Sequence, residues 1–153
     1  MPDAAQDTGG EFRLMYRSHS RIPAGDRKAE LGVLFTQARS RNKARSLSGA
    51  LLVSDDWFVQ VLEGDEQTVR ALFARIQQDG RHDSVTLLQS DFVGQRVFAR
   101  WAMAEVSDAG GGDIPLIAHA DGISPAAGRG TTPEQDAILD LMRSAVRAAP
   151  QAV

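Results

Sequence analysis

The stretch WFVQVLEG, residues 57–64, alternates its side chains between two apolar faces and therefore predicts a buried β-strand. One residue does not fit this pattern, because Gln60 shares its face with Phe58 and Leu62. Its primary amide carries two donors and one acceptor, and an amide without partners in a protein interior costs a few kcal/mol. The main question that the sequence raises is therefore which groups bond to Gln60.

The segments around this strand alternate between strand and helix patterns. Strands are predicted over residues 11–18, 46–53, 57–64, 84–92 and 95–106. Apolar stripes with helical spacing predict helices over residues 26–42 and 65–80. The resulting β-α-β-β-α-β-β order is typical of a ferredoxin-like α+β sandwich, with a mixed five-stranded sheet and both helices on one face.

The two ends of the chain differ from this central part. A C-terminal helix is predicted over residues 133–149, because Thr132 to Gln135 form a capping box with proline at the first helical position. This helix, or a partner subunit, would cover the second face of the sheet. Residues 1–10 are predicted to be a disordered leader and residues 108–132 a linker, so the folded domain would span residues 11–107.

The composition excludes several classes of function. A net charge of −3 gives no reason to expect nucleic acid or an anionic membrane as a partner. The chain has no cysteine, which rules out disulfides and thiolate metal sites. No apolar run approaches the roughly 18 residues that span a bilayer, and the polar start is unlike a signal peptide. We therefore expect a cytoplasmic protein.

Carboxylates and histidines give little indication of catalysis. Glu63 follows a strand and suits capping of the next helix. The histidines at positions 19, 82 and 119 lack the spacing of metal ligands, so no metal site is predicted. The stretch GRHD, residues 80–83, could bind a phosphate or could be a solvated helix exit.

A more informative group of residues lies on otherwise apolar elements. Its members are Tyr16, Asn42, Gln60, Trp101 and Met103. Tyr16 ends the core-facing row of the first strand, and a β-α-β-β unit places the strand of Gln60 beside it. Trp101 and Met103 share one face of the last predicted strand. Each residue alone suits a structural role, but together they predict a pocket between two helices and a sheet for a planar heterocycle.

In this order and spacing, these residues resemble the BLUF domain, a family of blue-light sensors that use FAD. The resemblance extends from Phe12 to Val106. It is carried by the motifs LMYRS (14–18), ARSRNKARSLSGALL (38–52), FVQVLEG (58–64), IQQDGRH (76–82) and RVFARWAM (96–103). It implies the same fold, noncovalently bound FAD, and a sensor domain over residues 11–107.

The resemblance also implies roles for the five residues of the expected pocket. Tyr16 matches the redox-active tyrosine of the family, and Gln60 matches the glutamine between that phenol and the flavin. Asn42 matches the asparagine that hydrogen-bonds the edge of the flavin ring. Trp101 and Met103 match the pair whose placement next to the glutamine relays the signal.

Further cofactor contacts are implied on and after the second helix. Arg75 and Asp79 match positions near the ribityl chain and the ring edge, although an exposed ion pair would also explain them. Arg81 and His82 match a region near the FAD phosphates. 

Two residues depart from the family pattern at this site. Arg41 stands where the family usually has asparagine or histidine beside Asn42, and we expect it to contact the cofactor. Ala38 occupies a position that is often serine, so a hydroxyl group next to the flavin would be missing.

The function implied by the resemblance is that of a blue-light photoreceptor and not of an enzyme. Light would drive electron and proton transfer from Tyr16 to the flavin through Gln60, and the changed hydrogen bonds would signal to a separate protein. A homodimer or higher oligomer is expected, and the effector and the biological response cannot be inferred from these residues.

Two other classes of function stay open at this point. The first is a light-blind interaction module on the same fold, which Arg41 and Ala38 would favour. The second is a small hydrolase. It would use the stretch GQRVFARW, residues 94–101, as an anion-binding loop, but acylphosphatases carry that loop after the first strand instead.

Overall fold

The computed structural model describes residues 11–54, 56–107, 113–115, 118–119, 122–123 and 132–148. The predictions of a leader over residues 1–10 and of most of the linker over 108–132 lie outside the described residues. Among the described residues, no helix has the length and hydropathy of a membrane span. The same part of the chain contains no group of three or more side chains that could hold a metal ion.

A mixed six-stranded sheet forms the centre of the fold, with the order β5-β2-β4-β3-β6-β7. Its strands are β2 (Glu11–Ser20), β3 (Ser48–Ser54), β4 (Trp57–Gly64), β5 (His82–Val93), β6 (Ala104–Ser107) and β7 (Ile114–Pro115). The first five give the mixed α+β sheet that the sequence predicts, and the two-residue β7 extends it at one edge. A separate hairpin joins β8 (Ala118–His119) to β9 (Gly122–Ile123).

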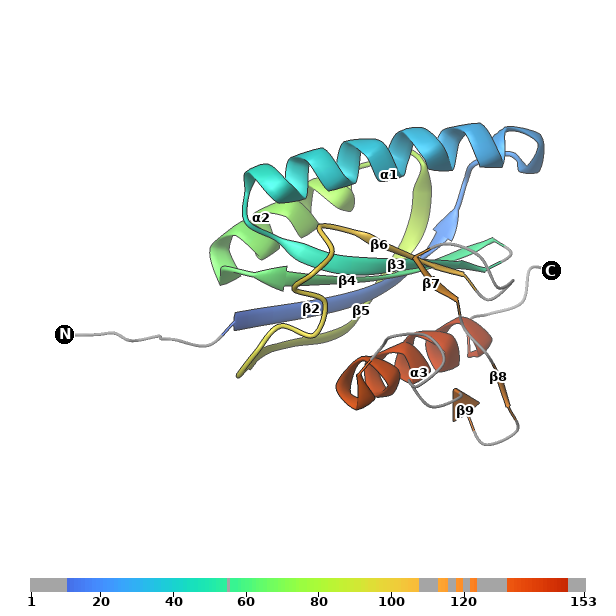
Figure 1. Cartoon of the computed structure of the whole chain (residues 1–153). Helices are drawn as coiled ribbons and strands as arrows, with labels where there is room; N and C mark the ends of the chain where they lie inside the picture. Colours follow the sequence, from blue (N-terminus) through green and yellow to red (C-terminus); the bar gives the residue numbers. More distant parts are fainter. Residues whose placement is uncertain are drawn as a thin grey trace.

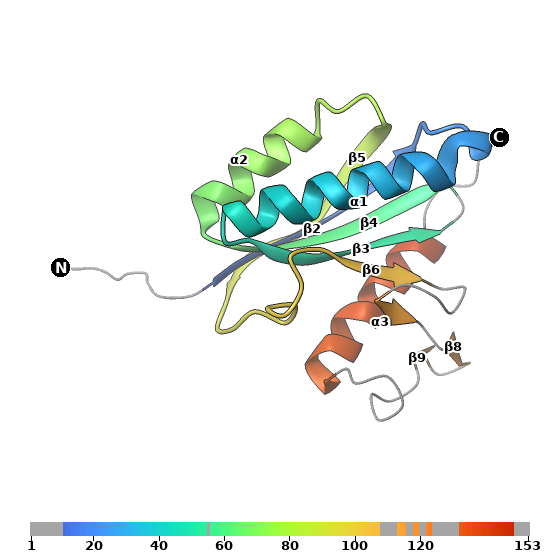
Figure 2. The same ribbon diagram turned by 45° about the horizontal axis from the view of Figure 1, so that its top comes forward.

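Helices cover both faces of the sheet (Figure 1). One face carries α1 (Arg27–Ala44) and α2 (Glu66–Ile76), which lie next to each other in Figure 2. A 3₁₀ turn, Ala24–Asp26, leads into α1. The opposite face carries α3 (Pro133–Arg147), so the C-terminal helix covers the face that the first two helices leave free.

Local sequence explains where two of these helices begin. The side chain of Asp65 accepts a hydrogen bond from the backbone N–H of Thr68 and so caps α2. At α3, Thr132 and Gln135 form the predicted reciprocal capping box, with Pro133 in the first turn. These caps satisfy N–H groups that have no partner inside the helix.

The last predicted strand is wrong in its extent. The sequence predicts a strand over residues 95–106, whereas β6 covers only Ala104–Ser107 and pairs in parallel with β3. Residues 97–103 instead form an irregular segment, which we call the connecting segment. Phe98, Val97 and Trp101 of this segment pack in the core that includes α3 instead of pairing as a strand.

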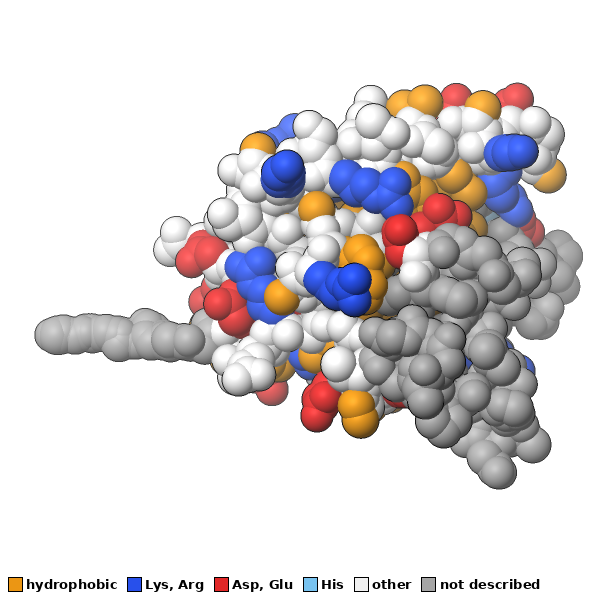
Figure 3. Space-filling model, viewed as in Figure 1, with side chains coloured by type: hydrophobic (Ala, Val, Ile, Leu, Met, Phe, Trp, Pro, Cys, Tyr) orange, Lys and Arg blue, Asp and Glu red, His pale blue; other side chains and the backbone are white. Residues whose placement is uncertain are grey.

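Two apolar cores lie on the two faces of the sheet. The first core, under α1 and α2, includes Leu14, Tyr16, Leu51, Leu62 and Met103. The second core, under α3, contains Met15, Val59, Val61, Phe98, Leu139 and Met142, among others. Consecutive residues of β2 and β4 therefore contribute to opposite cores, as the alternation of a strand requires. On the surface, basic and acidic side chains are interspersed over the face shown in Figure 3.

Candidate functional site

A pocket lies between the sheet and the two helices that cover its first face. Its cavity volume is about 50 Å³, which is more than the space that one water molecule needs. Leu34, Leu51, Phe58 and Ile76 supply apolar walls, and the polar groups come from Tyr16, Gln37, Arg41, Gln60, Asp79, Arg81 and His82. Aliphatic walls with a few convergent polar groups suit a flat heterocyclic ligand.

The phenol of Tyr16 and the amide of Gln60 meet at this pocket. The two residues face each other directly in the antiparallel register of β2 and β4, and both are buried. The Tyr16 hydroxyl donates a hydrogen bond to Oε1 of Gln60. On its other side, Nε2 of Gln60 lies 3.6 Å from Sδ of Met103, a weak acceptor. The buried amide thus has one strong partner and one weak one within the protein.

The environment of Tyr16 holds its phenol in the protonated form. Burial raises the pKa of Tyr16 well above its usual value, because the ionised phenolate would lose its hydration. Arg41 opposes this shift, since its positive charge favours the phenolate. The phenol is therefore a hydrogen-bond donor across the physiological pH range.

Charged groups line the rim of the pocket. Arg81 donates to the carboxylate of Asp79 at 2.6 Å, and this bond lowers the pKa of Asp79 and raises that of Arg81. Arg41 is half-buried, and its burial, together with repulsion from Arg45, lowers its pKa. The Nε of Arg41 is buried and has no hydrogen-bond partner among the described residues. Arg41 thus leaves a donor free at the pocket wall.

His82 joins the pocket wall to the sheet. Its Nε2 lies 2.6 Å from the backbone carbonyl of Ile76, and its Nδ1 lies 2.7 Å from the hydroxyl of Ser18. Because a carbonyl oxygen only accepts, Nε2 carries the proton and Nδ1 accepts from Ser18 in the neutral ring. Both ring nitrogens are therefore engaged within the protein.

Asn42 is brought near the connecting segment but does not line the pocket. Its side chain is fully buried, and its Nδ2 donates to the carbonyl of Ala102 at 2.8 Å. Its Oδ1 is buried and has no partner among the described residues. An orphaned buried acceptor is costly, so it indicates a hydrogen-bond donor missing from the protein alone. Of these two residues only Arg41 lines the pocket, so its free donor is the one that fits a cofactor with acceptors at its ring edge.

Arg75 does not reach this pocket. It is exposed and lies at a separate shallow depression that Arg45 and Asp65 also line. The alternative, an exposed ion pair between Arg75 and Asp79, is wrong, because Asp79 pairs with Arg81. The physical reason is that α2 ends at Ile76, so Arg75 and Asp79 do not have the i,i+4 spacing of one continuous helix.

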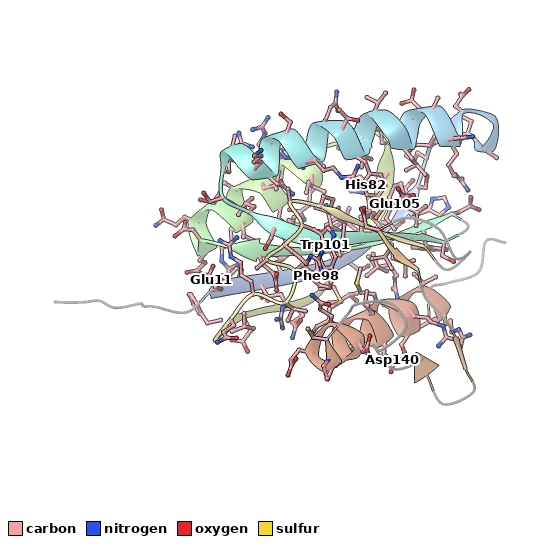
Figure 4. All side chains as sticks on the ribbon, viewed as in Figure 1. Glu11, His82, Phe98, Trp101, Glu105 and Asp140 are labelled. Carbon is pink, nitrogen blue, oxygen red and sulfur yellow. The ribbon has the colours of Figure 1, made fainter. Side chains whose placement is uncertain are left out.

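Trp101 and Met103 do not share one face of a strand. Both lie in the irregular connecting segment, and the segment directs them to opposite sides of the sheet. Met103 is buried in the first core beside Gln60, whereas half-buried Trp101 packs against the second core. Its ring centroid is 6.4 Å from that of Phe98, and the two are adjacent in Figure 4, while His82 lies nearer α1. Met103 is therefore the neighbour of Gln60.

Sequence reasoning missed one polar residue in this region. Glu63 is fully buried and, contrary to the prediction, does not cap a helix. Its carboxylate instead accepts from the backbone N–H groups of Val97 and Phe98, at 2.8 Å each. The signal was available in the motif VLEG, where Glu63 directly follows two apolar residues of a buried strand. A carboxylate at such a position is expected to be buried and to need several hydrogen-bond donors.

Comparison with known proteins identifies relatives of this chain. The sequence profile of the family described as "BLUF: Sensors of blue-light using FAD" matches residues 12–104. The photoactivated adenylate cyclase subunit alpha of Euglena gracilis is 36% identical over 93 residues, which cover 61% of this chain and 9% of that protein. This chain therefore corresponds to a small part of that curated relative.

Solved structures show the same fold. The photo-activated state of BlsA superposes with a TM-score of 0.62 at 33% identity, covering 63% of this chain and 69% of BlsA. The dark-state structure of BlrB, described as a BLUF protein, has a TM-score of 0.65 at 24% identity. This second match covers 92% of this chain and 98% of BlrB, so the likeness in fold extends beyond the sheet and its first two helices.

Proposed function

Because the chain belongs to the BLUF family, the sensors of blue light using FAD, we propose that it is a photoreceptor whose light reaction is carried by Tyr16 and Gln60. The observation that supports this proposal most directly is the hydrogen bond from the Tyr16 hydroxyl to Oε1 of Gln60 at the wall of an open pocket. The chain has one tyrosine, so no second phenol can take this role.

The residues around the pocket divide the task of holding the cofactor. Aliphatic side chains would contact the faces of the flavin ring, and Arg41, Asn42 and Gln60 would bond to its edge. Arg81 would lie toward the phosphates, whereas both ring nitrogens of His82 are already bonded within the protein. Bound FAD supplies the absorption of blue light and an excited state that is a strong oxidant. 

Tyr16 and Gln60 would carry out the proton and electron transfer. A phenol is a good electron donor, and it becomes a strong acid once it is oxidised. The proton of Tyr16 already points at Oε1 of Gln60, so the acceptor is within hydrogen-bond reach. Gln60 can relay this proton because its amide has a donor end and an acceptor end. After the electron and the proton have both returned to Tyr16, Gln60 would be left with a changed set of hydrogen bonds, which would revert in the dark.

Met103 would pass this change on to the rest of the protein. Its sulfur is a weak acceptor for Nε2 of Gln60, so rotation of the amide costs little on that side. A changed contact at Met103 would shift the connecting segment and bias α3. The size of this population shift is limited to the few kcal/mol that such hydrogen bonds supply. No substrate turns over in this scheme, and the signal would reach a separate protein through α3 or through a homo-oligomer.

The absorption spectrum before and after blue light tests the proposal. Protein purified with FAD should be yellow, should shift its absorption to longer wavelength on illumination, and should recover in the dark. Gln60→Leu should keep the bound flavin and lose the shift, because leucine cannot relay a proton. A full shift in this variant would remove Gln60 from the reaction.

A light-blind interaction module is the second candidate, and the charge of Arg41 at the pocket wall favours it. Arg41 adds a second positive charge near Arg81, which would repel a flavin that has to place its own hydrogen-bond donors there. Colourless protein that stays unchanged when FAD is added would support this alternative and contradict the photoreceptor.

A further inference from the structure

The carboxylate of Glu63 is a buried junction between three strands and the connecting segment. Glu63 lies three residues after Gln60 on β4 and is fully buried. It accepts from Arg13 on β2 at 3.2 Å and from Ser48 on β3 at 3.3 Å. Its two oxygens also accept from the backbone N–H groups at the start of the connecting segment, at 2.8 Å each. Hydrogen bonds to a carboxylate are about twice as strong as neutral ones, so this end of the segment is firmly held.

The far end of the connecting segment is held by α1 and contacts the photochemical pair. Asn42 donates to the carbonyl of Ala102 at 2.8 Å, and Arg39 donates to the carbonyl of Met103 at 3.1 Å. The Met103 side chain contacts Gln60. In the middle of the segment, the N–H of Trp101 donates to the carbonyl of Phe98 at 3.0 Å, which closes a turn. The segment is therefore short, internally bonded and fixed at both ends.

Gln135 connects the same segment to α3. Its Oε1 accepts from the backbone of Thr132 at 2.9 Å and completes the capping box. Its Nε2 donates to the carbonyl of Val97 at 2.8 Å. Val97 thus donates its N–H to Glu63 and offers its carbonyl to Gln135. One residue of the segment carries the contacts to both the sheet and the start of α3.

From this arrangement we infer that Glu63 and Gln135 are positioning residues that couple β4, the connecting segment and the first turn of α3 into one unit. The coupling itself is a property of the folded chain. Its use in transmitting the response of Gln60 through Met103 to α3 rests on the proposed function. Because coupling between two sites is reciprocal, a change at Glu63 should be felt at the start of α3, and a change at Gln135 should be felt at Val97.

The coupling is tested by amide hydrogen exchange, measured by NMR in the dark. Each substitution is made at one end of the unit, and exchange is measured at the other end. Glu63→Gln replaces one accepting oxygen with a donor, so it should speed exchange of the Gln135 and Asp136 amides at least tenfold. Gln135→Glu keeps the oxygen that completes the capping box but removes the donor to Val97. It should speed exchange of the Val97 and Phe98 amides by a similar factor. Unchanged exchange at the opposite end in Gln135→Glu overturns the inference.

Two design points keep this test decisive. Glu63→Gln leaves the buried Arg13 without its counter-charge and could prevent folding, and in that case Gln135→Glu alone decides. The matched control is Gln67→Glu, which makes the same chemical change in the first turn of α2 at an exposed position. The control should leave the exchange of Val97 and Phe98 as in the unmodified protein. A tenfold effect in the control would show that added charge, and not the lost donor, causes the change.

An illuminated sample then tests whether light uses this route. In the unmodified protein, blue light should change the exchange of α3 amides from Asp136 onward. Gln135→Glu should keep the red shift of the absorption and lose at least two thirds of that change. A full light-induced change at α3 in this variant contradicts the route. Absence of a red shift in the unmodified protein refutes the photoreceptor instead, while the dark exchange still decides the coupling.

Discussion

The two faces of the sheet are covered in different ways. The face under α1 and α2 holds a pocket with a cavity volume of about 50 Å³ and the buried polar groups of Tyr16 and Gln60. The face under α3 is packed with apolar side chains, among them the fully buried Leu139 and Met142. Protein interiors usually leave few voids larger than a water molecule, so the first face is the exception. The difference indicates that α3 packs closely on the sheet, whereas α1 and α2 leave space for a ligand above it.

We call the face under α1 and α2 the open face and the face under α3 the closed face. The largest expected effect comes from removing the hydroxyl of Tyr16 on the open face. Tyr16→Phe deletes one hydroxyl and retains the ring, so flavin should stay bound while the light-induced red shift is lost completely. The reason is that phenylalanine has no proton to give to Gln60. Absorption spectra before and after illumination measure this directly.

The adjacent residue on the same strand provides the matched control. Met15 belongs to the closed face, and Met15→Leu conserves volume, so it should cost less than about 1.5 kcal/mol and keep the red shift. A normal photocycle in Tyr16→Phe would refute the assignment of the phenol. Loss of the shift in Met15→Leu would show that the two faces are not separate.

An intermediate effect is expected on the free energy of unfolding. Here a substitution under α3 should have the larger effect, and a substitution at the pocket the smaller one. Leu139→Ala on α3 should lower the free energy of unfolding by about 2–5 kcal/mol, because Leu139 is fully buried in a closely packed core. Leu34→Ala should cost clearly less, because Leu34 is half-buried and borders space that is already empty. Urea denaturation of both variants without flavin measures the difference. Equal costs would contradict the contrast between the faces.

The most gradual effect is on the pH dependence of stability. The phenol ionises near pH 10 in the unfolded chain, whereas burial raises the pKa of Tyr16 in the folded protein. Above pH 10 the folded state therefore binds one proton more, and the free energy of unfolding should fall by up to about 1.4 kcal/mol per pH unit. Tyr16→Phe should lack this part of the slope. Because the chain has one tyrosine, tyrosinate absorbance reports this residue alone, and its appearance near pH 10 in folded protein would contradict the burial effect.

The sequence predicts the open face well for a simple reason. Strand alternation determines which side chains share a face, and the β-α-β-β connection places β4 next to β2. These two local rules bring Tyr16 opposite Gln60, as the register shows. The capping box of Thr132 and Gln135 is local in the same way and was predicted correctly, whereas the cap of α2 was assigned to Glu63 and is Asp65.

The connecting segment was not predictable in the same way, because its partners are distant in the sequence. Val97, Phe98 and Trp101 suggest a strand by their apolar character, but the carboxylate of Glu63 takes the N–H groups that a neighbouring strand would have bonded. The expected ion pair between Arg75 and Asp79 is absent for a related reason, since the predicted helix over residues 65–80 ends at Ile76 in the structure. In both cases the local sequence pattern fits the predicted structure and the observed structure about equally well.

The single tyrosine opposite Gln60 has a practical consequence for experiment. Cells supplied with ring-fluorinated tyrosine would alter one side chain in the whole protein, and that side chain is Tyr16. Fluorine makes a phenol more acidic while adding little volume, so a series of such analogues would grade the donor strength of one hydrogen bond without mutagenesis. Every change in the optical response could then be traced to a single oxygen atom, and a fluorine nucleus would report from that position with no background.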